Sequence, residues 1–148
     1  MKYDHWKDVP QVLWPYENFA PGEISCGGGD CEFCGGSIIV HHGAMARLQA
    51  TRDMVGAGLL INTGFRCAGR NSLVGGVTSS RHLLGQAFDI SLAGHDPATI
   101  LAAVTAQAWD GRGFYRTFLH VDLRPRRAQW MSKPGRAFWS PYFKGDAL

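Results

Sequence analysis

The sequence predicts a small α+β domain with a central antiparallel or mixed sheet flanked by helices. Two segments place apolar residues at helical spacing, and three others show the short apolar or alternating pattern of strands. The elements follow in the order helix, strand, long loop, strand, helix, strand, and hairpin signals are weak. A chain of 148 residues is long enough to bury a core of its own.

The first 36 residues show no sustained period and are rich in Trp, Pro, Gly and Cys. We therefore expect residues 1–36 to form an irregular N-terminal arm that wraps the core and ends in a Cys/Gly knuckle. The predicted organisation is a single domain over residues 1–148, with this arm at its start.

The first regular elements follow the arm. Apolar residues recur at helical spacing over residues 41–55, and Gly56 and Gly58 then act as stop signals, which predicts an amphipathic helix. Residues 59–63 are short, apolar and partly β-branched, as in a buried strand. The Gly-rich residues 64–81 are expected to form a loop, and a long loop inside a compact domain usually has a function.

Two later segments alternate between apolar and polar residues and are predicted to be strands. Within residues 86–91, Asp89 shares a face with Ala87, opposite the apolar residues. Within residues 118–123, His120 and Asp122 share the polar face. Between these strands, Asp96 and Pro97 mark the start of a second helix that should end near Gly111.

Composition excludes several classes of protein. The chain is 45% hydrophobic and 18% charged, as in an ordinary globular protein. It contains no apolar run of membrane-spanning length, and its first ten residues lack the apolar stretch of a signal peptide. A net charge of +3 suits an anionic partner but is too small and scattered to indicate nucleic-acid binding.

Three side chains of metal-ligand type lie on or beside the predicted strands: His82, Asp89 and His120. A catalytic zinc site uses three protein ligands from the His and carboxylate set and keeps one position open for water. The bound metal lowers the pKa of that water towards neutrality. Two histidines and one aspartate meet this requirement if the fold brings them together.

Three ordered motifs carry a family resemblance. Residues 79–90, S-S-R-H-L-L-G-Q-A-F-D-I, resemble the H-x-x-G-x-A-x-D signature of the peptidase M15 family, which includes zinc D-Ala-D-Ala carboxypeptidases and related phage endolysins. F-L-H-V-D at residues 118–122 is similar to the second metal motif of the family's H-x-D branch. I-N-T-G-F-R-C at residues 61–67, followed by Asn71 and a Gly-Gly pair, resembles its S-G-Y-R…N…G-G segment.

The resemblance implies a hedgehog/D,D-peptidase-like fold and assigns roles to individual residues. His82, Asp89 and His120 would be the zinc ligands. Arg66 would bind a substrate carboxylate or carbonyl, because its planar guanidinium can form two parallel hydrogen bonds. Ser80 would brace the loop or touch substrate, and Tyr115 could donate a hydrogen bond to the oxyanion.

The general base is an open question at this stage. Many family members have an acidic residue three positions before the last His, but this chain has Thr117 there. Asp122, on the same strand face as His120, could deprotonate the metal-bound water. It could equally accept the free ring N–H of a ligating histidine.

The implied activity is zinc-dependent hydrolysis of peptidoglycan stem peptides or cross-links, by a D,D-carboxypeptidase or an endopeptidase such as a phage lysin. The alternative is a catalytically inactive zinc-containing module that binds the cell wall or a protein. The expected partner is a peptidoglycan peptide, with no nucleic acid and no membrane, and the expected state is a monomer. We expect synthesis in the cytoplasm and action at the cell wall after release or within a phage particle.

The four cysteines form a second candidate group: Cys26, Cys31, Cys34 and Cys67. Intervening gaps of four and two residues separate the first three, and neighbouring glycines allow a tight knuckle. A structural zinc bound by four thiolates, a disulfide with two free thiols, and four free thiols are all compatible with this pattern. A link to Cys67 would tie the arm to the segment that carries Arg66.

Overall fold

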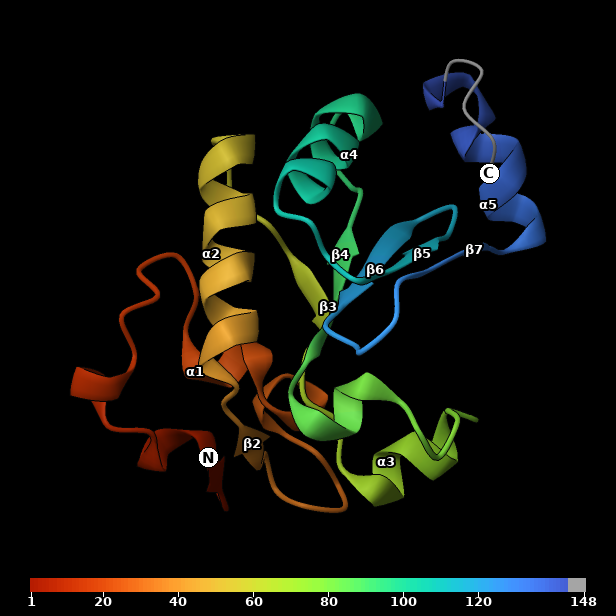
Figure 1. Cartoon of the computed structure of the whole chain (residues 1–148). Coiled ribbons are helices and arrows are strands. Elements are labelled where there is room, and N and C mark those ends of the chain that lie inside the picture. The colour runs from red at the N-terminus through yellow and green to blue at the C-terminus, as the bar shows by residue number, and fades with distance from the viewer. Residues whose placement is uncertain (144–148) are drawn as a thin grey trace.

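A computed structural model describes residues 1–143 and contains a five-stranded mixed sheet (Figure 1). The strands lie in the order β3, β4, β6, β5, β7, and only β5 and β7 run parallel to each other. Their bounds are β3 Ile61–Thr63, β4 Ala87–Ser91, β5 Gly111–Phe114, β6 Phe118–Asp122 and β7 Ala128–Met131. The predicted α+β class with a mixed sheet is confirmed.

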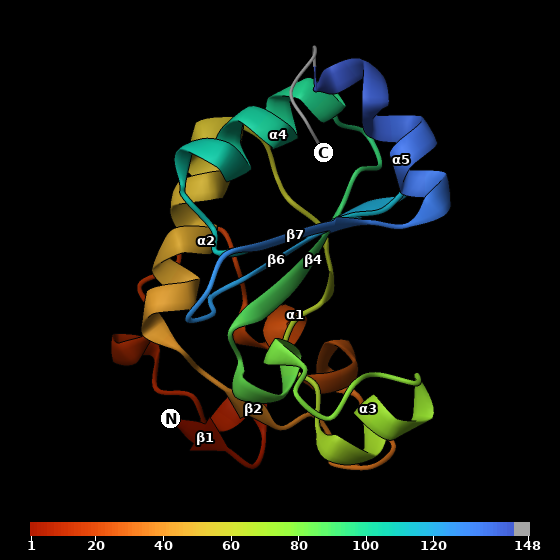
Figure 2. The same cartoon turned by 45° about the vertical axis from the view of Figure 1, so that its right-hand side comes forward.

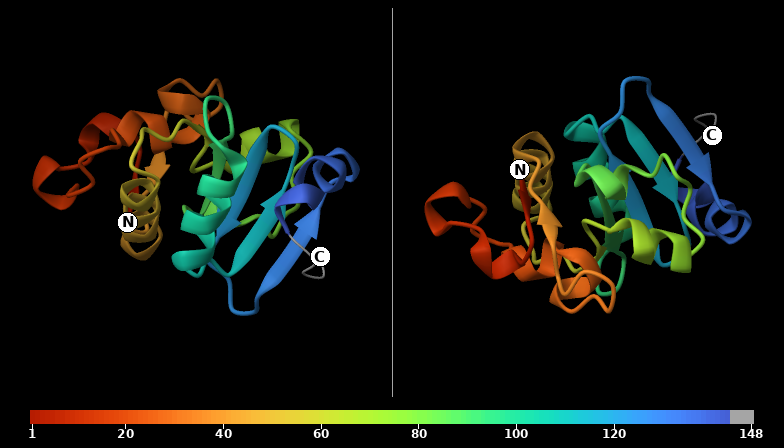
Figure 3. Two further views of the ribbon diagram at one scale, coloured as in Figure 1. Left: turned by 90° about the horizontal axis from the view of Figure 1, so that it is seen from above. Right: turned by 90° about the horizontal axis from the view of Figure 1, so that it is seen from below.

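Three helices lie over one face of this sheet: α2 His42–Val55, α4 Pro97–Ala106 and α5 Lys133–Trp139 (Figure 2). The short helix α3 (Ala68–Leu73) and the 3-10 helix η4 (Arg81–Leu84) lie over the opposite face, as the view from below shows (Figure 3). One face of the sheet is therefore covered by α2, α4 and α5, and the other faces a segment of loops and short helical turns.

Local capping explains where the two predicted helices begin and end. Nδ1 of His41 accepts a hydrogen bond from the backbone N–H of Ala44 at 3.1 Å, and Gly56 ends α2 in the left-handed conformation. Oδ1 of Asp96 accepts the N–H of Ala98 at 3.1 Å, and Pro97 is the first residue of α4. Both predicted starts are confirmed.

The strand alternation separates the core from the functional face. The side chains of Phe88, Ile90, Leu119 and Val121 are fully buried in the core. Their neighbours Ala87, Asp89, His120 and Asp122 alternate with them in sequence and so point to the other face. The predicted alternation along β4 and β6 is confirmed.

Several elements differ from the sequence-based expectations. The loop predicted over residues 64–81 contains α3. The helix predicted to end near Gly111 ends at Ala106, because Ala108 takes a positive φ of 52° that a right-handed helix cannot include. The strands β5 and β7 and the helix α5 were not predicted. Two glycines in the four residues of β5 remove the apolar alternation that would indicate a strand.

The arm is irregular but contains short elements. Its first strand, β1 (Lys2–Tyr3), pairs antiparallel with β2 (Ile38–Ile39), and the short helix α1 (Pro21–Ile24) is followed by the 3-10 turn η3 (Cys26–Gly29). The last five residues of the predicted domain, 144–148, lie outside the described residues. Within residues 1–143, no helix is long and apolar enough to cross a membrane.

Candidate metal centre

Asp89 and His120 face each other across two neighbouring strands. The antiparallel pairing of β4 and β6 places Asp89 directly opposite His120 and Ala87 opposite Asp122. Directly opposed side chains on one face are the closest pairs in an antiparallel sheet. Nδ1 of His120 accordingly lies 2.9 Å from Oδ1 of Asp89.

His82 reaches the same point from η4. Oγ of Ser80 accepts the backbone N–H of His82 at 3.3 Å and begins this turn, and Gly85 ends it in the left-handed conformation. Nδ1 of His82 lies 2.7 Å from the carbonyl oxygen of Gly64. A carbonyl oxygen can only accept, so Nδ1 carries the proton and Nε2 keeps its lone pair.

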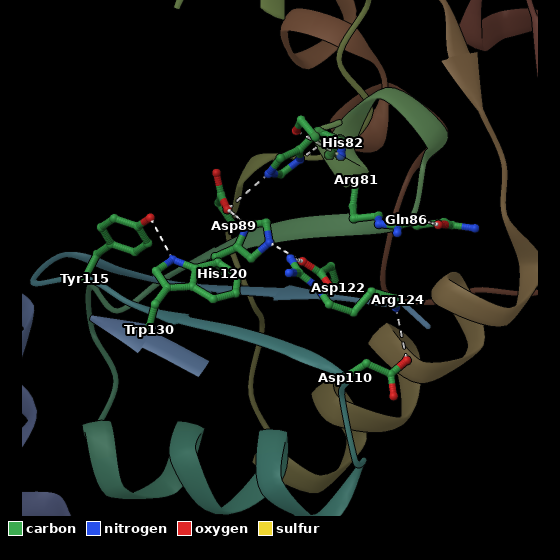
Figure 4. A network of polar contacts seen from close by, with 12 residues as sticks. Arg81, His82, Gln86, Asp89, Asp110, Tyr115, His120, Asp122, Arg124 and Trp130 are labelled. Atoms are coloured by element: carbon green, nitrogen blue, oxygen red, sulfur yellow. Dashed lines mark hydrogen bonds and ion pairs between the residues drawn. The ribbon is translucent and has the colours of Figure 1, made fainter. Parts of the chain in front are cut away.

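The three side chains converge on one point, as Figure 4 shows. Nε2 of His82 lies 3.3 Å from Oδ1 of Asp89, and one ligand atom from each of the three residues lies within 4.8 Å of the others. Each imidazole uses its other nitrogen in a separate hydrogen bond, which fixes the ring orientation. Two imidazole nitrogens and a carboxylate oxygen match the ligand set of a catalytic zinc site.

Asp122 is fully buried beneath this group, and both its oxygens are hydrogen-bonded. Oδ2 accepts from Nε2 of His120 at 2.8 Å and from Nη2 of Arg124, while Oδ1 accepts from Nε of Arg124 at 2.7 Å. Burial raises the pKa of Asp122, but hydrogen bonds and charge from Arg124 and His120 outweigh it and lower that pKa to about 2.

The pKa values of Asp89 and His120 respond to the same contacts. Burial alone would raise the pKa of Asp89, but the two histidines hold it well below its usual range. For His120, burial lowers the pKa, whereas hydrogen bonds and charge from Asp122 and Asp89 raise it more strongly. The contacts therefore favour the ionised forms of both carboxylates, Asp89 and Asp122.

A cleft of about 260 Å³ lies over His120 and Asp122. Its walls include Ser79, Ser80, Arg81, Arg124 and Trp130. The rings of Trp130 and His120 have centroids 5.3 Å apart, and the guanidinium of Arg124 lies 4.9 Å from the Trp130 ring. The metal centre therefore borders an open space large enough for part of a peptide.

Arg124 and Trp130 were not singled out from the sequence. Two glycines of β5 make room for the group: a Cβ on Gly111 would collide with the carboxylate of Asp122, and one on Gly113 would lie 2.6 Å from the indole of Trp130. The alternating glycines opposite the H-x-D motif were the signal in the sequence that could have indicated a crowded face.

Arg66 lies beside the centre, and among the interactions of residues 1–143 its side chain makes no hydrogen bond or ion pair with the three candidate ligands. Its backbone N–H donates to the carbonyl of His82 at 3.1 Å, and its Nη1 donates to Oδ1 of Asn71 at 2.9 Å. Burial lowers the pKa of Arg66, and the nearby charge of Asp89 acts in the opposite direction. Arg66 lines a second pocket of about 260 Å³ together with Gly64 and Arg70.

Three further residues were considered from the sequence, Tyr115, Thr117 and Ser80, and of these Ser80 lines the cleft. The hydroxyl oxygen of Tyr115 accepts the indole N–H of Trp130 at 3.0 Å, and its ring stacks on Phe118. Thr117 is exposed in the turn before β6. Ser80 lines the cleft and also caps η4.

The fold and the group together define a small α+β protein with a candidate catalytic metal centre. Residues 17–122 match the sequence model of the family described as Peptidase M15. Because the match covers more than half of the chain and includes all three candidate ligands, the protein belongs to the peptidase M15 family. A comparison with curated proteins returned no match.

Proposed function

We propose that this peptidase is zinc-dependent and hydrolyses peptide bonds in the stem peptides or cross-links of bacterial peptidoglycan. The observation that carries the proposal is the convergence of Nε2 of His82, Oδ1 of Asp89 and Nδ1 of His120 beside a cleft. Membership of the peptidase M15 family supports peptide hydrolysis as the reaction. The substrate class rests on the resemblance of the three motifs to wall-degrading members.

The chemistry of the ligand set favours zinc over harder cations. Imidazole suits zinc, whereas magnesium and calcium prefer oxygen ligands alone. When bound here, zinc would act as a Lewis acid on the scissile carbonyl and would lower the pKa of a bound water. His82 and His120 enter this arrangement already oriented by Gly64 and Asp122.

Asp122 acts in this proposal as a positioning residue. It accepts the Nε2–H of His120, so that Nδ1 of the same ring keeps its lone pair towards Asp89 and the metal position. Arg124 holds the carboxylate in place from the other side. The pair therefore fixes both the tautomer and the orientation of His120.

The basic side chains around the cleft suit a peptide that carries a carboxylate. Arg124 and Arg81 line the cleft itself, and Arg66 lines a second pocket. A guanidinium can bind a carboxylate by two parallel hydrogen bonds. We assign Arg66 to the carboxylate or carbonyl of the substrate, and the cleft beside Trp130 to the peptide backbone.

A specific observation favours the second candidate, an inactive zinc-containing module that binds the wall or a protein. Both oxygens of Asp122 already accept hydrogen bonds from His120 and Arg124, and Thr117 offers no carboxylate. A binding module would retain the metal and the cleft but would not cleave a peptide.

Digestion of purified peptidoglycan by the zinc-loaded protein tests the proposal. Free D-Ala among the products identifies a carboxypeptidase, and release of separated stem peptides identifies an endopeptidase. A chelator and the His82→Ala variant should each abolish release. If the folded, zinc-loaded protein binds peptidoglycan but releases no fragment, the inactive module replaces the peptidase.

A further inference from the structure

A second cluster of metal-ligand type lies outside the candidate catalytic centre. Its members are Cys26, Cys31, Cys34 and Cys67, whose four Sγ atoms all lie within 4.8 Å of one another. Cys26 begins η3, Cys31 and Cys34 lie in the turn that follows, and Cys67 caps α3. Two separate segments of the chain therefore meet at this point.

The spacing of the sulfur atoms fits a tetrahedral ion. Zinc bound by four thiolates at about 2.3 Å requires neighbouring sulfur atoms about 3.8 Å apart. Sγ of Cys31 lies 3.7 Å from Sγ of Cys67. All four cysteines are free, and 3.7 Å is well beyond the length of about 2.05 Å that a disulfide bond needs.

Backbone N–H groups point at two of the sulfur atoms. The N–H of Cys67 donates to Sγ of Cys26 at 3.2 Å, and the N–H of Arg70 donates to Sγ of Cys67 at 3.4 Å. Donors of this kind stabilise the thiolate form, which is the form that binds a metal.

The surrounding backbone is built for this close approach. Gly27 has a φ of +68°, and a Cβ there would lie 3.1 Å from Cβ of Cys31. Gly36 has a φ of +102°, and a Cβ there would lie 2.6 Å from the carbonyl oxygen of Gly29. Glycine at these positions lets the two halves of the knuckle pack against each other.

We propose that Cys26, Cys31, Cys34 and Cys67 bind a structural Zn²⁺ that fastens the N-terminal arm to the segment carrying Gly64 and Arg66. Four protein ligands leave no open position, as in structural zinc sites. Cys26 and Cys31 are buried, which fits a closed site. The proposal does not depend on the peptidase activity, because it concerns a different set of ligands.

The connection between the two centres is short. The N–H of Phe65 donates to the carbonyl of Ile24 at 2.7 Å, and Cys67 directly follows Arg66. The carbonyl of Gly64 is the acceptor that orients His82. A metal at the four cysteines would therefore hold in place the segment that orients one ligand of the first centre and carries its candidate substrate-binding arginine.

Metal counting and spectroscopy on the whole chain test this site. The protein is prepared under reducing conditions and loaded with Zn²⁺ or Co²⁺. We expect two metal equivalents in the native protein and one in His82→Ala, which keeps the cysteines. The metal remaining in His82→Ala should show an all-sulfur first shell near about 2.3 Å by X-ray absorption, and its cobalt form should show thiolate charge-transfer bands.

The Cys34→Ser variant should lose this sulfur-bound metal and retain the metal at the histidine site. Thr105→Ser, at an exposed position of α4 outside both centres, is the control and should keep both metals. Should Cys34→Ser fail to fold, the native protein alone still decides the question through the sulfur content of its metal shell. The proposal is overturned if the folded native protein takes up metal without any metal–sulfur signal. It is also overturned if the cysteines form disulfides in protein prepared without an added oxidant.

Discussion

Asp122 holds His120 from the side opposite to Asp89: its carboxylate lies 2.8 Å from Nε2, while Nδ1 of the same ring lies 2.9 Å from Oδ1 of Asp89. The imidazole of His120 thus contacts one carboxylate from β4 and one from its own strand, β6. Only one of them, Asp89, also faces His82. Asp89 therefore faces the candidate metal position, whereas Asp122 orients the ring of His120.

Replacing Asp122 by Asn should weaken metal binding. The change removes the charge that favours the Nε2–H tautomer, and losses of this kind typically cost about 10- to 100-fold in metal affinity or activity. We expect activity to recover in part at high zinc concentration. Isothermal titration with Zn²⁺ and peptidase assays across zinc concentrations measure both effects.

Asp53→Asn, which replaces an exposed aspartate, is the control for Asp122→Asn and should change neither the zinc affinity nor the peptidase activity. Because Asp122 is buried, circular dichroism must show that the variant is folded. A folded variant with native zinc affinity and no turnover at any zinc concentration would instead identify Asp122 as the general base.

Removing the metal should abolish peptidase activity and lower the melting temperature. A ligand present at 1,000 times its dissociation constant stabilises the folded state by about 4 kcal/mol. Dialysis against a chelator followed by calorimetry measures the loss, and added zinc should restore both properties. Calcium or magnesium should not, and restoration by either would contradict the assigned ligand preference.

Arg66→Ala should raise KM for a peptide with a free terminal carboxylate. A hydrogen bond to a charged group contributes about 1.5–3 kcal/mol, which corresponds to an increase of about 10- to 150-fold. Arg66→Lys should recover only part of the loss, because an ammonium group cannot form the paired hydrogen bonds. Steady-state kinetics measure KM for each variant, and Arg116→Ala, which replaces an exposed arginine, is the control. An unchanged KM in Arg66→Ala removes this residue from substrate binding.

Gly111→Ala should destabilise the fold and weaken metal binding together. The added methyl group would collide with the carboxylate of Asp122, and overpacking of this kind costs about 1–3 kcal/mol. Gly58→Ala, where a Cβ meets nothing within 4 Å, should leave both properties unchanged. Urea unfolding and zinc titration of the two variants provide the comparison, and a Gly111→Ala protein of native stability would refute the crowding argument.

The sequence predicted the parts of the fold that depend on local chemistry. The caps at Asp96 and Gly56 and the alternation around Asp89 and His120 each depend on neighbouring residues, so pattern alone located them. Strand β5 was missed because Gly111 and Gly113 replace the side chains that would reveal it. Those glycines are explained only by Asp122 and Trp130, which come later in the chain.

The candidate ligands were accessible from the sequence, but the contacts that orient them were not. His82, Asp89 and His120 lie in recognisable motifs, whereas the hydrogen bond from His82 to Gly64 joins residues that are distant in the chain. The place of Arg124 likewise depends on its pairing with buried Asp122 and on Trp130 from the parallel strand β7. Such contacts arise from the three-dimensional arrangement of the strands.

The pairing of Asp89 with His120 links metal affinity to strand alignment. A shift of β4 along β6 by one residue would turn one of these side chains into the core and bring an apolar residue to the metal face. An alignment shifted by one residue could therefore not bring all three ligands to the ion. A metal that binds during folding would favour the native alignment over those shifted by one residue, and it would then contribute to the accuracy of folding as well as to the chemistry of the finished site.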